Sequence, residues 1–151
     1  MRIKTFIGNL EERWHDWRAA NAKEPPDDHR AFGRWGEEQA AKALRRRGWK
    51  VLYRNFRAEA GGEVDLICRD RETLSFVEVK ARRTEAFGRP SHAVNQDKQR
   101  LIIRGAFAWL RLLDRPDLTF RFDIVEVLAE KERTTIRVLE SAFHLPDVYR
   151  Y

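Results

Sequence analysis

The chain has 151 residues, of which 42% are hydrophobic and 36% are charged. These values describe one globular domain that can bury roughly two-thirds of the surface of its unfolded chain. The single cysteine excludes an intrachain disulfide, no CxxC zinc framework is present, and no apolar run approaches the roughly 18 residues of a membrane span. We therefore expect a cytoplasmic protein with neither a membrane span nor a signal peptide.

The formal net charge is +6 at pH 7, and the cations are 23 arginines against 7 lysines. Because the planar guanidinium fork matches phosphate oxygens better than an ammonium does, this excess favours an anionic partner. Ordinary solvated surface charge is the alternative that composition alone leaves open.

The N-terminal segment predicts a helix over residues 3–19, because apolar side chains recur at helical spacing: Leu10, Trp14 and Trp17. A Pro-Pro pair then prevents a helix from continuing. The sequence thus predicts a helical appendage over residues 1–22, a linker over 23–30, and a main domain over 31–151.

The main domain is predicted to alternate between helical and extended segments. The expected elements are a helix over 33–47, strands over 49–55, 63–68 and 74–80, a helix over 95–113, and strands over 119–128 and 134–139. Gly48 is a plausible stop for the first helix, and Asn95 is the candidate N-cap of the second. This order, α-β-β-β-α-β-β, predicts an α/β fold with a mixed four- to five-stranded sheet flanked by helices.

The second and third strands predict a hairpin with a definite register. A turn centred between residues 71 and 72 pairs residues whose numbers sum to 143. Asp65 then lies opposite Glu78, and Glu63 lies opposite Lys80. These four side chains share one face near one end of the hairpin, and the other face is expected to be apolar.

Acids that face each other across a sheet destabilise it unless a cation lies between them. Carboxylate oxygens are ligands for Mg²⁺, so Asp65 and Glu78 are candidate metal ligands, with Lys80 beside them to stabilise charge on a phosphate. Glu37 lies on the apolar stripe of the first helix and adds a third candidate acid. The alternative is structural, with these acids paired to nearby arginines and lysines.

Asp65 followed by Glu78-Val79-Lys80 resembles the PD-(D/E)xK nuclease superfamily, which has the restriction-endonuclease-like fold. The main domain as a whole resembles the uncharacterised bacterial YraN-like branch of that superfamily. The segments that carry the resemblance are residues 33–38, 54–57, 62–67, 76–82, 94–100 and 121–125. This resemblance implies a core similar to that of Holliday-junction resolvases.

The resemblance also implies roles for individual residues. Lys80 would be the catalytic lysine, and Glu37 would contact a metal, Mg²⁺ or Mn²⁺, or its water. Val64 stands where the name of the superfamily has proline. The implied metal ligands are Asp65, Glu78 and the backbone carbonyl of Val79.

Several further side chains are candidates for contact with nucleic acid. Lys98 begins the second helix, where backbone N–H groups favour phosphate, and we prefer a phosphate contact for it over a surface salt bridge. The full set is Arg82, Arg83, Lys98, Gln99, Arg100, Arg34 and Arg57, with Glu63 as possible support for the acids.

The sequence thus predicts a metal-dependent endonuclease acting on DNA, including branched or damaged structures. The alternatives are a nucleic-acid-binding module without turnover, a subunit that recruits a partner, and a nuclease directed at RNA. Since resolvase-like chemistry needs two cuts, a homodimer is plausible by analogy.

Overall fold

The computed structural model describes residues 14–18, 23–83, 94–114 and 117–149. Two long helices and six strands make up this part of the chain, and a short 3-10 helix, Asp147–Tyr149, follows the last strand. The helices are α1 (His29–Arg46) and α2 (Gln96–Leu113), and the strands are β1 (Trp14–Arg18), β2 (Lys50–Arg57), β3 (Glu63–Asp70), β4 (Thr73–Arg82), β5 (Thr119–Ala129) and β6 (Thr134–Phe143). Neither described helix is long and apolar enough to cross a membrane.

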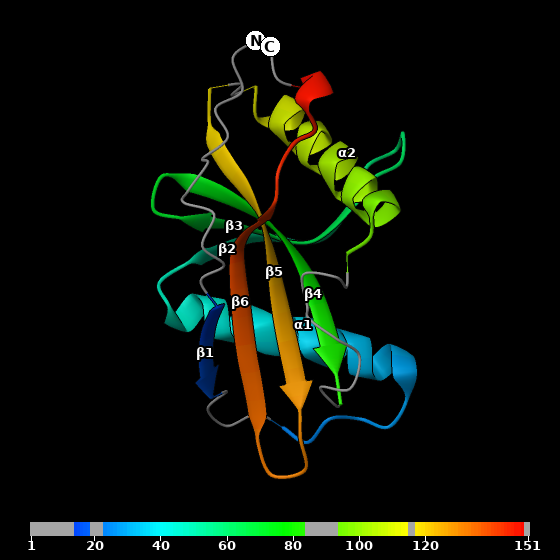
Figure 1. Cartoon of the computed structure of the whole chain (residues 1–151), viewed down its shortest axis with the longest axis vertical. Helices are drawn as coiled ribbons and strands as arrows, with labels where there is room; N and C mark the ends of the chain where they lie inside the picture. The colour runs from blue at the N-terminus through cyan, green and yellow to red at the C-terminus, as the bar shows by residue number, and fades with distance from the viewer. Residues whose placement is uncertain (1–13, 19–22, 84–93, 115–116, 150–151) are drawn as a thin grey trace.

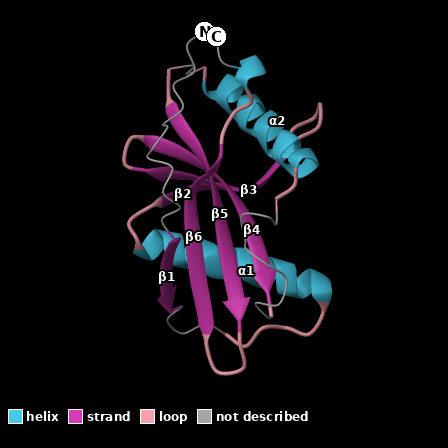
Figure 2. Cartoon of the chain, in the orientation of Figure 1, coloured by secondary structure: helices cyan, strands magenta, loops and turns pink. Residues whose placement is uncertain are grey.

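The strands form one twisted sheet in the order β1-β6-β5-β4-β3-β2. Only β4 and β5 are parallel among these described strands, and α2 makes the crossover between them. Figure 2 shows the strands fanning out, with α1 crossing one end of the sheet and α2 beside the other. The predicted α/β class and the order from α1 to β6 are confirmed.

Local signals placed several element boundaries well. Asn95 caps α2, with its Oδ1 accepting the backbone N–H of Lys98 at 2.9 Å. Helix α1 begins four residues earlier than predicted, because Asp28 rather than a later residue caps it and accepts the Ala31 N–H at 2.8 Å. Gly48 follows α1 with φ +89°, which suits the left-handed stop that ends many helices.

The predicted N-terminal helix is wrong over residues 14–18, which form strand β1. This strand pairs antiparallel with β6, from Trp14 opposite Leu139 to Arg18 opposite Thr135. Edge pairing with an existing strand satisfies the backbone hydrogen bonds of so short a segment, which overrides a weak helical periodicity. The rest of that predicted helix lies outside the described residues, and the proposed division into appendage, linker and domain stays a prediction.

The register predicted for the β3–β4 hairpin is confirmed from Leu66 to the turn, but the predicted pairs Asp65–Glu78 and Glu63–Lys80 are not part of the ladder. Leu66 lies opposite Val77, and the ladder runs to Asp70 opposite Thr73, so every pair sums to 143. The face expected to be apolar carries Leu66 and Val77 in one hydrophobic cluster, and the face with acids near one end is also apolar over Ile67 and Phe76, so the sheet is covered on both faces. A parallel β-α-β crossover places a helix over one face, and α1 covers the other.

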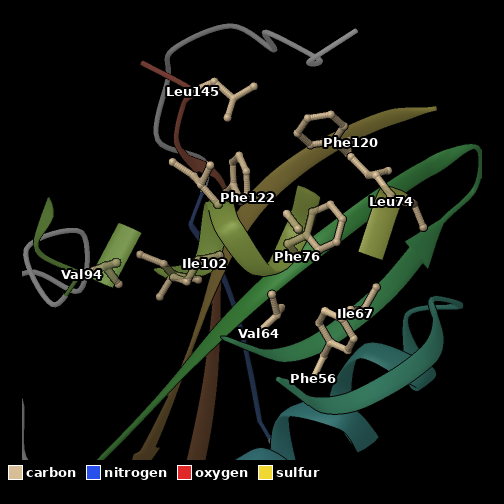
Figure 3. Close-up of a cluster of buried hydrophobic side chains, with 14 of the residues drawn as sticks. Phe56, Val64, Ile67, Leu74, Phe76, Val94, Ile102, Phe120, Phe122 and Leu145 are labelled. Carbon is tan, nitrogen blue, oxygen red and sulfur yellow. The ribbon is translucent and has the colours of Figure 1, made fainter. Parts of the chain in front are cut away.

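Two hydrophobic clusters lie on opposite faces of the sheet. The cluster under α2 includes Ile67, Phe76 and Ile102 (Figure 3), and the cluster under α1 includes Leu44, Leu66 and other small and branched residues. Figure 1 shows α1 running across the lower half of the sheet and α2 beside its upper end. The acids of β3 and β4 must therefore find room between two apolar layers.

Candidate metal centre

The centre of the candidate site is a change of face in strand β3. Val64 belongs to the cluster under α2, but Leu66 belongs to the cluster under α1, although residues two apart on a strand normally share a face. Strand β2 does the same beside it, since Phe56 packs with Val64 on the α2 side and Arg54 lies opposite Leu66. Asp65 is thus the residue at which the alternation of side chains between the two faces of the sheet is interrupted.

The physical cause lies in β2. Asn55 has φ +52°, a left-handed conformation that reverses the normal alternation of a strand and that asparagine tolerates better than most residues. In the β2–β3 register, Arg54 faces Leu66 and Phe56 faces Val64, so Asn55 falls beside Asp65. The change of face in β2 at Asn55 and the change of face in β3 at Asp65 are therefore one structural feature.

Asp65 is freed from the β3–β4 ladder by this change. The ladder stops at Leu66 and Val77, and Oδ2 of Asp65 accepts the backbone N–H of Val79 at 2.8 Å instead. This hydrogen bond fixes the carboxylate next to Glu78, whose pKa responds to the charge of Asp65. The predicted neighbours are therefore neighbours, through a side-chain contact rather than a backbone pair.

Glu78 is the most deeply placed acid of the group, with only 3% of its surface exposed. Lys80 Nζ lies 3.2 Å from its Oε1, and Lys98 Nζ lies 3.6 Å from the same oxygen. The other oxygen, Oε2, is buried and accepts no hydrogen bond from the described residues. A buried, ionised carboxylate oxygen without a donor is costly. Either a proton shared with Asp65, whose side chain hydrogen-bonds to Glu78, or a metal ion would offset that cost.

Glu63 and Lys98 form a second ion pair at the rim. Lys98 Nζ donates to Glu63 Oε1, and Arg57 Nη1 lies 3.4 Å from Glu63 Oε2. Since β3 supplies Glu63 and α2 supplies Lys98, the pair ties the helix to the strand at the edge of the acid group. Lys98 therefore bridges Glu63 and Glu78.

Glu37 approaches from α1, on the opposite side of the sheet from Lys98. It follows Gly36, where a Cβ would fall 2.6 Å from the Cβ of Ala81, so the glycine lets α1 come close to β4. The Asn55 side chain hydrogen-bonds to Glu37, and the charge of Asp65 reaches it. Glu37 thus lies at the end of the buried stripe predicted for this helix.

Burial controls the protonation of these acids. Burial and then the Asp65 charge raise the pKa of Glu78 to about 7, although Lys98 and Lys80 oppose the rise. The same two causes raise the pKa of Glu37, against the Asn55 hydrogen bond and nearby arginines. The pKa of Glu63 is lowered instead, chiefly by its hydrogen bond from Lys98.

The donor set fits a hard divalent cation. Within the described residues, no group of three or more acidic, histidine or cysteine side chains is placed to hold a metal ion. Mg²⁺ does not require one, because it keeps several waters and is held by one or two carboxylates together with substrate phosphates. Asp65 and the bare oxygen of Glu78 are such a pair, and the charge of Asp65 also reaches Glu37.

Comparison with known proteins gives the chain its relatives. The model of the uncharacterised protein family UPF0102 matches residues 36–127, which is more than half of the chain. The chain belongs to family UPF0102. Among its relatives are UPF0102 proteins of Trichlorobacter lovleyi (43% identical over 78% of this chain and 93% of the relative), Geobacter sulfurreducens (41%, 78% and 91%) and Nocardia farcinica (48%, 67% and 79%).

The UPF0102 match spans every acid and lysine of the candidate site, from Glu37 to Lys98. It agrees with the resemblance to a YraN-like family that the motifs indicated.

The basic residues predicted to contact nucleic acid divide into two groups in this UPF0102 protein. Lys98 and Arg57 lie at Glu63, and the charge of Arg34 acts on Glu37, so these three surround the acids. The other four have partners away from them: Arg82 with Glu126, Arg83 with the carbonyl of Pro26, Gln99 with the carbonyl of Val94, and Arg100 with Asp97.

Two features of the site escaped the sequence analysis of this UPF0102 chain. One is Asn55, whose segment was recognised but given no role. The other is a close contact between helix and strand: a Cβ on Gly62 would fall 2.5 Å from the backbone nitrogen of Gly105. The Gly61-Gly62 pair can be seen in the sequence, but its partner on α2 cannot.

Proposed function

We propose that this UPF0102 protein is a divalent-metal-dependent endonuclease that hydrolyses phosphodiester bonds in DNA, including branched or damaged DNA. The observation that carries the proposal is Glu78, a buried acid with one bare oxygen, beside Asp65 and within 3.2 Å of Lys80. Buried charged groups with shifted pKa values are frequent at functional sites. In this protein the buried charge belongs to Glu78, which lies beside a second acid and a lysine.

Each residue would have a distinct part. Asp65, Glu78 and the Val79 carbonyl would hold Mg²⁺ or Mn²⁺, which when bound supplies electrostatic stabilisation of the charge that develops on the phosphate. Glu37 would orient the attacking water. Lys80 would move its ammonium from Glu78 toward the phosphate as negative charge develops there.

The surrounding cations suit a substrate that is read by its backbone. Arg57 is largely exposed next to Glu63, and Arg34 is exposed on α1 near Glu37. Such contacts position phosphates and carry little base information, so recognition would depend on DNA shape more than on sequence. Binding should then weaken steeply with salt, because counterions are released from the DNA.

The test is a panel of labelled substrates (linear, flap, four-way junction and single-stranded) with and without metal. Asp65→Asn should abolish metal-dependent cleavage and leave DNA binding largely intact. Glu38→Gln is the matched control, because Glu38 neighbours Glu37 on α1 but pairs with Arg54 at 2.6 Å. If Asp65→Asn cuts as fast as the parent, the site assignment is wrong.

One observation favours a second candidate, a nucleic-acid-binding module without turnover. Lys80 and Lys98 already compensate Glu78 without any metal, so the arrangement is compatible with a purely structural role. Calorimetric titration with Mn²⁺ separates the two: saturable binding lost in Asp65→Asn favours the enzyme, and no binding at millimolar metal with DNA present favours the module. A homodimer that makes paired cuts is tested by the solution mass of the chain with and without residues 1–22.

A further inference from the structure

Helix α2 is held unusually close to the start of β3. Besides the Gly62 contact, a Cβ on Gly105 would meet Cγ2 of Val64 at 2.9 Å and the backbone nitrogen of Glu63 at 3.1 Å. Lys98 lies seven residues before Gly105, and positions seven apart on a helix share a face. The contact that brings α2 to the strand therefore also directs Lys98 to the acids.

Lys98 is held in that position by several interactions. Its ammonium contacts Glu63 Oε1 and lies 3.6 Å from Glu78 Oε1, and its side chain is 23% exposed. Its backbone N–H is taken by the N-cap Asn95, so the residue sits in the first turn of α2. Burial acts to lower the pKa of Lys98, but the hydrogen bond to Glu63 and the charges of Glu78 and Glu63 raise it, so the group stays charged.

The charges explain why this lysine matters for a metal. Four acids surround the site (Glu37, Glu63, Asp65 and Glu78), and two ammonium groups, those of Lys80 and Lys98, partly offset them. A dication that reached Asp65 and Glu78 would be repelled by both ammonium groups. Both lysines are partly exposed, Lys80 by 32% and Lys98 by 23%, and both have long, flexible side chains. Lys98 differs because its ammonium contacts two acids on β3 and β4, Glu63 and Glu78, so its departure would uncover both.

We propose that Lys98 is a built-in cation that occupies Glu63 and Glu78 in the resting protein, and that transfer of its ammonium to a DNA phosphate opens the site to a divalent metal. This inference rests on the proposed function. DNA and metal would then bind cooperatively, since each favours the state in which Lys98 has left the acids. The protein would hold metal weakly until a phosphate backbone is present.

A salt bridge that only stabilises the fold would behave differently. Removing its lysine would lower the free energy of unfolding and leave two acids less compensated, but it would not make metal binding independent of DNA. The dependence of metal affinity on DNA therefore separates the two roles.

The experiment measures Mn²⁺ affinity by calorimetry for the parent and for Lys98→Met, alone and with a short phosphorothioate DNA duplex at low salt. This duplex keeps the backbone charge and resists hydrolysis. We expect Lys98→Met to bind Mn²⁺ about tenfold more tightly than the parent without DNA, because one repelling charge is gone. We expect DNA to tighten Mn²⁺ binding by the parent and to change that of the variant little.

Two variants act as controls. Lys98→Arg keeps the charge and should retain the DNA dependence. Lys42→Met removes a lysine that lies 3.8 Å from Glu38 on α1, away from the site, and should match the parent. Thermal unfolding of each variant shows that it is folded, and Lys98→Gln replaces Lys98→Met if the latter is not.

The outcomes distinguish this inference from the proposed function. If the parent binds Mn²⁺ and Asp65→Asn does not, but Lys98→Met has unchanged or weaker affinity, the role of Lys98 is wrong and the metal site stands. The same conclusion follows if DNA leaves the Mn²⁺ affinity of the parent unchanged. If the folded parent and Lys98→Met both fail to bind Mn²⁺ with DNA present, both the inference and the proposed function are overturned.

Discussion

Replacing Glu78 by glutamine should stabilise the metal-free protein at alkaline pH. The pKa of Glu78 is about 7, against an ordinary value of 4.5. Each pKa unit corresponds to about 1.4 kcal/mol, so ionised Glu78 costs the folded state about 3 kcal/mol. Because only 4% of this side chain is exposed, solvent screens little of that cost.

The sign follows from which state binds the proton more tightly. Folded Glu78 keeps its proton to higher pH than the unfolded chain does, so its contribution to stability is complete below pH 4.5 and is lost as pH rises through about 7. Glutamine cannot ionise and removes this loss. The free energy of unfolding of Glu78→Gln should therefore exceed that of the parent by up to about 3 kcal/mol at about pH 8, and the gap should shrink toward about pH 5.

Urea denaturation with a chelator, at several pH values between these limits, measures the difference. Glu132→Gln, in the exposed turn between β5 and β6, is the control and should follow the parent. Added Mg²⁺ should stabilise the parent and not Glu78→Gln, because only the parent keeps the carboxylate ligand. Equal pH dependence in the parent and Glu78→Gln would refute the reasoning from burial.

The remaining predictions concern the features that shape the site. Asn55→Ala should lower the free energy of unfolding, measured by urea denaturation, by about 1–2 kcal/mol, because alanine tolerates φ +52° poorly. Asn55→Gly should recover most of that loss. It should not recover the Mn²⁺ affinity, because glycine lacks the side chain that hydrogen-bonds to Glu37. Gly62→Ala, with φ +119° and no room for a Cβ against α2, should cost at least about 1–3 kcal/mol and lower the Mn²⁺ affinity measured by calorimetry. Arg121→Met leaves the fully buried Asp123 without its 2.8 Å ion pair. The free energy of unfolding should therefore fall by about 3–5 kcal/mol. The Mn²⁺ affinity of the folded protein should not change.

The sequence predicted those parts of the site that depend on local rules. The β3–β4 register from Leu66 to the turn followed from a two-residue turn and strand alternation. It predicted that Asp65 and Glu78 are neighbours, although the ladder stops at Leu66 and Val77 and Asp65 is held by the Val79 N–H instead. The Asn95 cap and the stripe that ends at Glu37 were similarly local. Strand β1 was missed, because its pairing with β6 depends on a segment more than a hundred residues away.

The missed features of the site are contacts between distant segments or unusual backbone angles. A left-handed Asn55 looks like any asparagine in a strand, so the change of face that frees Asp65 could not be read from alternation. The approach of Gly62 to Gly105 joins residues that lie 43 positions apart, and nothing in the sequence around either glycine indicates which residue it contacts. Lys98 was predicted to meet phosphate, and its ion pairs with Glu63 and Glu78 became visible only once α2 was placed.

These contacts also explain how the fold tolerates a buried acid cluster. Lysines from two different elements, Lys80 on β4 and Lys98 on α2, converge on one oxygen of Glu78 and leave the other bare. The two lysines therefore compensate Glu78 without a metal, yet its Oε2 has no hydrogen-bond partner among the described residues. If Lys98 only compensated charge, an apolar pair of similar size would serve stability better than this costly arrangement. If Lys98 leaves for a phosphate, as we propose, the arrangement has a reason, because the movement that would bind DNA would also expose the ligand that a metal would need.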